Sequence, residues 1–148
     1  MTQKNDIVLK IKKVHNDSIV PTRAYEDDSG LDLHAYDTTV LAPGETKAIS
    51  TGIAFGIPKG MEIQVRPRSG MSLKTGIRVA NSPGTIDAGF IAPVGVILHN
   101  AGTLPYIVKK GDRIAQAVLC PVIIVTPTVV ESLEDTDRGS GAFGSTGV

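Results

Sequence analysis

A lone carboxylate lies within a turn-rich segment, residues 81–90, which reads Asn-Ser-Pro-Gly-Thr-Ile-Asp-Ala-Gly-Phe. Its Pro-Gly dipeptide favours a turn, and apolar runs at 77–80 and 94–98 flank it, so the segment predicts the tip of a β-hairpin. Asp87 is its only acid, and no Asp or Glu follows from 88 through 111. Such an acid, next to backbone and an aromatic ring, could activate a water. On this segment alone, a surface hairpin with a turn-stabilising aspartate is the simpler interpretation.

Three other positions have side chains suited to phosphate chemistry. Asp32 alternates with two leucines, so we expect it to point away from the main core or into a polar cavity. Ser69 suits the N-cap of a short helix at 71–74, whose start favours an anion, and Arg68 strengthens that preference. Gln116 lies among apolar neighbours and needs a partner, which could be protein, water or ligand.

The tail from residue 138 to residue 148 is rich in glycine and is expected to be a flexible arm. Its glycines offer backbone N–H groups that can surround a phosphate. Phe143 could stack on a base, and Arg138 could pair with a terminal phosphate. The arm is therefore a candidate functional segment as well as a candidate linker.

The elements that must position these residues are short strands. Sixteen glycines, nine prolines and few helical runs predict an all-β domain with tight turns. In the segment 113–119, Gln116 is expected to share a face with Ile114 and Val118. The predicted strands are 7–12, 31–35, 46–57 with possible bulges at Gly52 and Gly56, 61–66, 113–119, and two more between 118 and 130, kinked at Pro121 and Pro127.

Composition narrows the classes of function. The 148 residues suit one domain. Fifteen basic and fifteen acidic residues give no net charge, which argues against a general nucleic-acid binder. One cysteine, Cys120, allows no disulfide within the chain, and no apolar run reaches about 20 residues. We expect a soluble, cytoplasmic protein without a membrane anchor or export signal.

Five segments together resemble the motifs of the trimeric deoxyuridine triphosphatases (dUTPases, dUTP nucleotidohydrolases), in the right order and at compatible spacings. They are Ser-Gly-Leu-Asp-Leu at 29–33, Pro-Arg-Ser-Gly at 67–70, Gly-Thr-Ile-Asp at 84–87, Gly-Asp-Arg-Ile-Ala-Gln at 111–116, and Arg-Gly-Ser-Gly-Ala-Phe-Gly-Ser-Thr-Gly at 138–147.

This resemblance implies a jelly-roll-like β-barrel body at 1–137 with one short helix, and an arm at 138–148 that closes over an active site. It also implies a homotrimer with shared active sites, Mg²⁺ as cofactor, and neither nucleic acid nor membrane as partner. The implied reaction converts dUTP to dUMP and pyrophosphate. That reaction limits uracil incorporation into DNA and supplies dUMP for thymidylate synthesis.

The same resemblance assigns catalytic roles residue by residue. Asp87 would activate the water that attacks the α-phosphorus, and Asp32 would hold Mg²⁺ mainly through waters. Gln116 would bond the phosphates or the ordered water. The phosphate-contacting second motif would be Arg68, Ser69 and Gly70.

Uracil would be read largely by main-chain groups, and the arm would close on the nucleotide. Phe90 would pack on the deoxyribose where the family usually has tyrosine, and Gly89 and Ala142 also depart from the family pattern. Phe143 would stack on uracil. The base-binding residues would be Asn81, Gly84, Thr85, Ile86 and Gly95. The other substrate-binding residues of the arm would be Arg138, Gly144, Ser145 and Thr146.

Two alternatives remain open on the sequence. The first is a dCTP deaminase, or its bifunctional deaminase–diphosphatase form, on the same fold. Those enzymes need a glutamate about ten residues past the aspartate as general acid and base, and Ile97 stands there instead. The second is a non-catalytic β-barrel module that binds nucleotide as an interaction signal.

Overall fold

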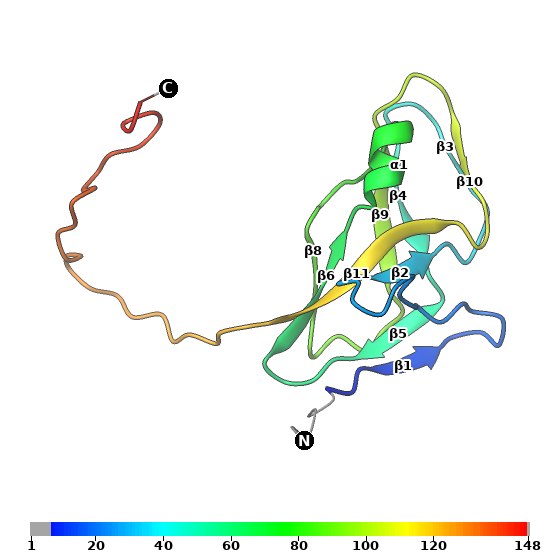
Figure 1. The fold of residues 1–148 in the computed structure, drawn as a ribbon, viewed down its shortest axis with the longest axis horizontal. Coiled ribbons are helices and arrows are strands. Elements are labelled where there is room, and N and C mark those ends of the chain that lie inside the picture. The colour runs from blue at the N-terminus through cyan, green and yellow to red at the C-terminus, as the bar shows by residue number, and fades with distance from the viewer. Residues whose placement is uncertain (1–6, 148) are drawn as a thin grey trace.

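A computed structural model describes residues 7–147 (Figure 1). Within that range the chain forms eleven strands and one helix. The elements are β1 Lys10–Lys13, β2 Leu31–His34, β3 Thr39–Leu41, β4 Thr46–Ser50, β5 Ile53–Gly56, β6 Met61–Arg66, α1 Ser69–Lys74, β7 Ile77–Val79, β8 Gly84–Asp87, β9 Gly95–Asn100, β10 Tyr106–Val108 and β11 Arg113–Pro121.

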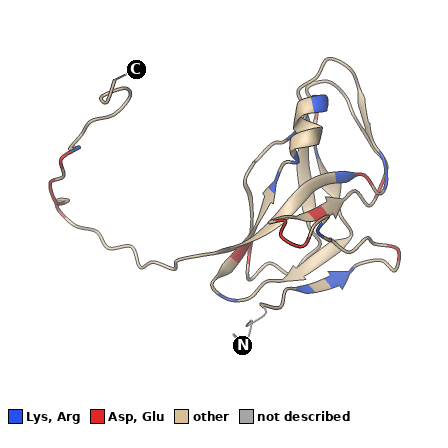
Figure 2. Cartoon of the chain, in the orientation of Figure 1, with Lys and Arg blue, Asp and Glu red and all other residues tan. Residues whose placement is uncertain are grey.

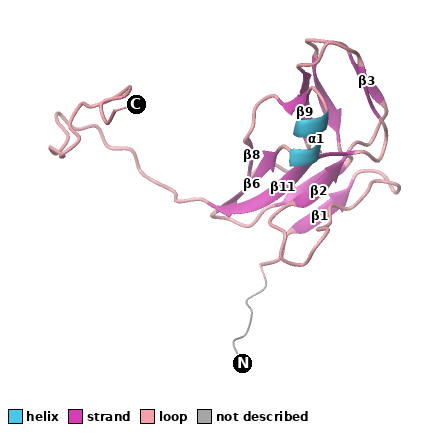
Figure 3. Cartoon of the chain, turned by 45° about the horizontal axis from the view of Figure 1, so that its top comes forward, coloured by secondary structure: helices cyan, strands magenta, loops and turns pink. Residues whose placement is uncertain are grey.

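The strands pair only in antiparallel fashion and form sheets around one core (Figure 3). The largest sheet has the order β2-β11-β6-β8, and a second has the order β4-β9-β7; β1 pairs with β5, and β3 with β10. Consecutive strands thus lie in different sheets, as in a jelly roll. The predicted all-β, jelly-roll-like fold with one short helix is confirmed, although the sheets do not join into one closed barrel.

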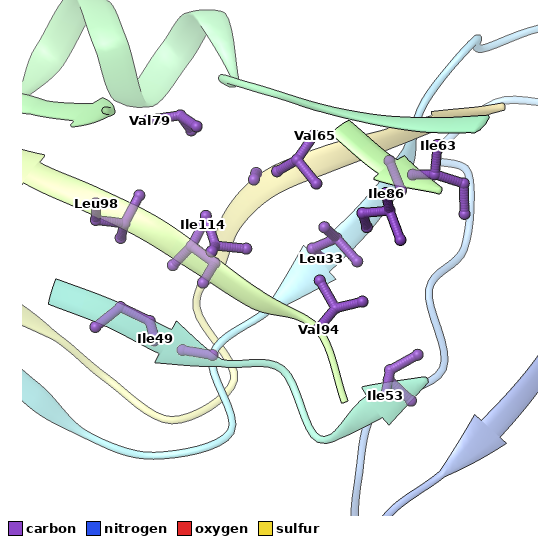
Figure 4. Packing of buried hydrophobic residues seen from close by; sticks show 14 of the residues in the cluster. Leu33, Ile49, Ile53, Ile63, Val65, Val79, Ile86, Val94, Leu98 and Ile114 are labelled. Atoms are coloured by element: carbon purple, nitrogen blue, oxygen red, sulfur yellow. The ribbon is translucent and has the colours of Figure 1, made fainter. Parts of the chain in front are cut away.

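The core is mainly aliphatic, with Phe55 as its buried aromatic side chain, and draws on every sheet; Figure 4 shows part of it. Strand β6 shows how it forms: Ile63 and Val65 are buried, while Glu62, Gln64 and Arg66 point to the other face. This alternation confirms the predicted strand at 61–66. It also places a row of polar side chains on the outer face of the large sheet, and the catalytic candidates lie along its edges.

The segment 81–90 is not a simple hairpin tip. Its flanking runs do pair, as β7 with β9. Between them, however, β8 leaves that sheet and pairs with β6, so that Asp87 lies opposite Glu62. Sequence periodicity identified strands here but could not identify their partners. Asp87 therefore stands at the end of an edge strand of the large sheet.

Four other predicted strands differ in the structure. The segment 46–57 is two strands because Gly52 adopts a φ of +65°, which turns the chain between sheets. The first strand begins at Lys10. The two strands predicted between 118 and 130 do not form as such: β11 continues to Pro121, and the described residues 122–130 form no strand and leave their apolar side chains largely exposed. Figure 2 shows this uncharged stretch leaving the body.

The predicted boundary between body and arm, at residue 137, lies within the extended tail, because the last strand of the sheets ends at Pro121. Residues 1–6 of the expected body and residue 148 of the expected arm lie outside the described range. No helix among residues 7–147 is long and apolar enough to cross a membrane.

Candidate active site

A cleft of about 250 Å³ lies at one edge of the large sheet, beside the start of α1. We call it the Arg68 cleft. Strands β2 and β11 hold two of its side chains in register, because Asp32 pairs with Gln116. Its lining is Ala24, Asp28, Ser29, Gly30, Asp32, Arg68, Ser69, Gly70 and Gln116. The predicted polar cavity for Asp32 is therefore present.

Two arginines fix the carboxylate of Asp32. The Nε atom of Arg68 donates to Oδ1 at 2.9 Å, and a terminal nitrogen of Arg113 lies 3.6 Å from Oδ2. The Asp32 side chain is only 17% exposed, so solvent screens the Arg68 pair less than it would a surface pair. The role of Arg113 was missed from the sequence, where this residue stands only as a member of the motif at 111–116.

The helix beside this cleft begins earlier than predicted. Ser69 is its first residue and not its N-cap; Arg68 occupies the cap with an extended backbone and provides no side-chain capping bond. The prediction of a Ser69 cap was wrong because the serine already has helical geometry. Backbone N–H groups in a first turn lack helical partners. Ser69 and Gly70 line the cleft with such groups.

Gln116 lies over a glycine that leaves room for it. Its Nε2 atom donates to the carbonyl oxygen of Pro67 at 3.0 Å, which supplies an internal partner. A Cβ atom on Gly30 would lie 2.1 Å from the amide oxygen of Gln116 and 2.9 Å from its Cβ. Only glycine allows the present position of the glutamine. Ile114 does not share the face of Gln116 as predicted, since an irregularity in β11 buries it in the core.

A second cleft, of about 220 Å³, lies on the other side of the sheet system around Asp87; we call it the Asp87 cleft. Strand β8 buries Gly84 and Ile86 and exposes Thr85 and Asp87. The backbone carbonyl of Asp87 accepts a bond from the N–H of Phe90 at 3.0 Å. The lining is Asn81, Thr85, Ile86, Asp87, Phe90, Val94, Gly95 and Ile97.

The predicted base-binding residues thus gather in one place, with one exception. Gly84 lies outside the lining, where a Cβ atom would be 3.1 Å from the side-chain nitrogen of Asn81. The glycine gives Asn81 its space. Val94 and Ile97 also line the cleft and were not proposed as site residues. Ile97, 37% exposed, provides an apolar wall where a deaminase would need its glutamate.

A single chain does not bring the two clefts together, because their linings share no residue. Asp32 and Asp87 lie on opposite edge strands of the large sheet, and their partners on β6 and β11 are also offset along the strands. From standard strand spacing, their Cα atoms are roughly 20 Å apart. A base must come within about 3 Å of the proton that it removes.

The predicted arm residues lie away from both clefts in this chain (Figure 1). The side chain of Phe143 is fully exposed. Arg138 donates from Nε to the carbonyl oxygen of Gly141 at 3.0 Å, within the arm itself. Gly144, Ser145 and Thr146 follow in turns near the end of the described chain.

A family model described as dUTPase matches residues 16–147. Deoxyuridine 5'-triphosphate nucleotidohydrolase of Picosynechococcus sp. is 50% identical over 139 residues, which cover 94% of this chain and 98% of the relative. The enzyme of the same name from Ehrlichia canis is 46% identical over 153 residues, with full coverage of both chains.

Solved structures agree with the sequence relatives. A Staphylococcus bacteriophage 80alpha dUTPase mutant with dUpNHpp has a TM-score of 0.89 and 30% identity, covering 95% of this chain and 99% of its own. A mutant dUTPase from phage phi11 of S. aureus, described as coordinating a structural Mg(II) ion, has a TM-score of 0.82 and 26% identity, covering 87% and 100%. Because the family model spans most of the residues and a relative of half identity spans nearly all of them, this chain belongs to the dUTPase family.

Proposed function

We propose that this protein hydrolyses dUTP to dUMP and pyrophosphate by attack of water on the α-phosphorus. The observation that carries the proposal is the complementary chemistry of its two clefts. The Arg68 cleft offers a guanidinium, an amide and the first N–H groups of a helix to phosphate oxygens. The Asp87 cleft offers a narrow, partly apolar space with a single carboxylate at its rim.

The lining of the Asp87 cleft supports the following proposed roles. Asp87 acts as general base on the attacking water, and backbone groups around Thr85 and Ile86 read the uracil edge. A narrow pocket of this kind disfavours the methyl group of thymine and the reversed hydrogen-bonding groups of cytosine. Phe90 packs on the deoxyribose, where a 2′-hydroxyl would meet its ring. Asn81 and Gly95 complete the pocket.

Phosphate binding is assigned to the Arg68 cleft, with Gln116 holding the phosphates or the attacking water. When bound, Mg²⁺ would supply positive charge that offsets the charge of the phosphates, and Asp32 would be the residue that holds it. Asp32 suits an outer role toward that ion, through water, because Arg68 and Arg113 already contact its two oxygens. Mg²⁺ keeps several waters and needs few protein carboxylates beside a triphosphate, which fits this donor set.

We also propose that the protein works as a homotrimer whose sites are shared between chains. Asp87 is too far from Gln116 of its own chain to serve the same phosphorus, so a second copy must bring its Asp87 cleft against this Arg68 cleft. The exposed apolar segment 122–130 supports assembly, since Ile123 is 88% exposed in the single chain. The arm at 138–148 then closes over a neighbour's nucleotide with Phe143 and Arg138. Gly144, Ser145 and Thr146 contact the terminal phosphate. A cytoplasmic location remains a prediction.

A pyrophosphate-release assay across dUTP, UTP, dTTP and dCTP with Mg²⁺ tests the reaction and both selectivities. We expect turnover of dUTP and at least about a hundredfold lower kcat/KM for the other three. Asp87→Asn should lower kcat by about 10²- to 10⁴-fold while dUTP still binds. Near-normal turnover by this variant would refute the assigned base.

A mixing experiment tests the shared site. Asp87→Asn and Gln116→Ala chains, each inactive alone, are unfolded together and refolded. Random assembly of shared sites leaves about a quarter with both wild-type residues, so activity should reappear. If each site lay within one chain, the mixture would stay inactive.

Ile97 argues against the deaminase alternative, because it gives the Asp87 cleft an apolar wall in place of a carboxylate. The relatives reported above also carry the dUTP nucleotidohydrolase name. Release of ammonia from dCTP is the decisive measurement, and appreciable turnover would reinstate that alternative.

A further inference from the structure

A third depression adjoins the Arg68 cleft and is larger, at about 450 Å³. We call it the Lys74 groove. It lies on the other side of Arg68, between α1 and the turn that precedes β11, and Arg68 and Gly70 line both depressions. The two spaces therefore meet at a guanidinium that the proposed reaction uses for phosphate.

The groove is lined by an excess of positive charge. Arg68, Lys74 and Arg113 are its three cations, and Asp112 is its acid. One carboxylate oxygen of Asp112 is taken by the backbone N–H of Lys109 at 2.8 Å. No ion pair joins Lys74 to an acid in the part of the chain between residues 7 and 147. Its ammonium group is thus available to an anion.

A histidine in the groove has an unused polar atom. The Nδ1 atom of His34 is buried and has no hydrogen-bond partner among the described residues. Burial lowers the pKa of His34, and the nearby cations Arg113 and Arg68 add to that effect against the opposing charge of Asp32. Buried polar atoms normally have a partner in protein, water or ligand. The groove therefore combines one free ammonium group, that of Lys74, with an unsatisfied ring nitrogen.

We infer that the Lys74 groove binds inorganic pyrophosphate and forms the route by which this product leaves the Arg68 cleft. The inference rests on the proposed function, which generates pyrophosphate beside Arg68. As the leaving group separates from dUMP it keeps its negative charges, and Lys74 and Arg113 offer the next cations along its path. Arg68 passes the anion from one depression to the other without any change in covalent bonding.

Calorimetric titration of inorganic pyrophosphate into the full-length protein tests the groove without turnover. The variants are Lys74→Gln, the charge-conserving Lys74→Arg, and Lys59→Gln, an exposed lysine on the turn before β6. We expect Lys74→Gln to weaken pyrophosphate binding by about five- to tenfold, because one charged contact is lost at a partly exposed site. Lys74→Arg and Lys59→Gln should bind as the wild type does. Inhibition of dUTP hydrolysis by added pyrophosphate should follow the same order.

Several outcomes would overturn the inference. The first is that the wild type does not bind pyrophosphate, and the second is that Lys74→Gln binds it with unchanged affinity. The third is that sulfate and sodium chloride of the same ionic strength displace pyrophosphate equally, which would mean that the salts act only by screening charge. Circular dichroism and elution volume establish that each variant is folded. A wild type that does not hydrolyse dUTP would defeat the proposed function, whereas normal hydrolysis with an unaffected Lys74→Gln affinity would defeat the groove alone.

Discussion

At the scale of single residues, the Arg68 cleft depends on close approaches between residues that are distant in sequence. Asp32 is fixed by arginines from α1 and from β11, and Gln116 occupies space that Gly30 leaves open. These contacts hold the phosphate-binding candidates in position without a ligand. Preorganised donors need less rearrangement when charge develops in a transition state.

Gly30→Ala should displace Gln116, because the new Cβ atom would lie within 3 Å of several of its atoms. We expect kcat/KM for dUTP to fall at least about tenfold, the usual cost of moving a positioning group by an ångström. In a Gln116→Gly background the same change should cost little free energy of unfolding, since all three clashing atoms of Gln116 are gone. Gly89→Ala is the matched control, as a Cβ there meets nothing within 4 Å. Additive losses in the double variant would contradict this explanation.

The lowered pKa of His34 predicts a pH dependence of stability. Its ordinary value is 6.5, so the unfolded chain binds the proton more tightly than the folded chain does. The free energy of unfolding should therefore fall as pH drops through 6.5. His34→Gln should lose less stability than the wild type between pH 7.5 and 5.5, measured by urea unfolding at equal protein concentration. Parallel pH profiles for the two proteins would show that His34 is not responsible.

At the scale of elements, strand order decides which side chains can cooperate. The sheet β2-β11-β6-β8 sets Asp32 beside Gln116 in register but places Asp87 on its opposite edge. Helix α1 adds Ser69 and Gly70 to the first cleft and Lys74 to the adjoining groove. Beyond β11 no strand forms within residues 122–147, and after the bond from the Val122 N–H to the carbonyl of Gly60 at 2.8 Å the described backbone makes no further bond to the body, so the arm is available to another chain.

Deleting residues 138–148 tests the separation of body and arm. Among its described residues, 138–147, the deletion removes no buried core residue, so far-UV circular dichroism and oligomeric state should match the wild type. We expect kcat/KM for dUTP to fall about a hundredfold or more, because stacking and phosphate contacts are lost together. Phe143→Ala alone should cost less. Normal hydrolysis by the truncated protein would show that the arm does not close over the site.

At the scale of the whole molecule, the described chain has two separate candidate clefts and an apolar segment that its own residues leave exposed. Its two candidate clefts lie on opposite edges of one sheet. The residues at 122–130 carry no charge and expose most of their side chains. Assembly with further copies would account for both features. A neighbouring chain can cover the segment 122–130, and it can place its Asp87 cleft against the Arg68 cleft of this chain.

Ile124→Asp should weaken the trimer, since a charge would replace an apolar side chain in the contact between copies. Sedimentation over a range of protein concentrations should show smaller species, and dUTP hydrolysis should fall with them. Leu104→Asp is a suitable control, because Leu104 is 75% exposed on the loop between β9 and β10. An unchanged trimer in Ile124→Asp would exclude this segment from the interface.

Local patterns in the sequence predicted much of the fold and many of the candidate site residues. Alternation alone identified β6, and turn residues marked many of its neighbours, because side-chain direction follows backbone geometry within a few residues. The family resemblance named most of the residues that line the two clefts, whereas the residues that it named in the arm lie apart from both. The N-cap at Ser69 and the strands beyond residue 121 were errors of the same local reasoning.

Only the tertiary structure decided which of these residues meet. A period of two gives the face of a strand but not its partner, so the pairing of β8 with β6 and the approach of Arg113 to Asp32 could not be read locally. The distance between Asp87 and Gln116 is likewise a property of strand order. Sequence determined the chemistry that this chain carries, and long-range pairing determined that one chain holds it in two separate places.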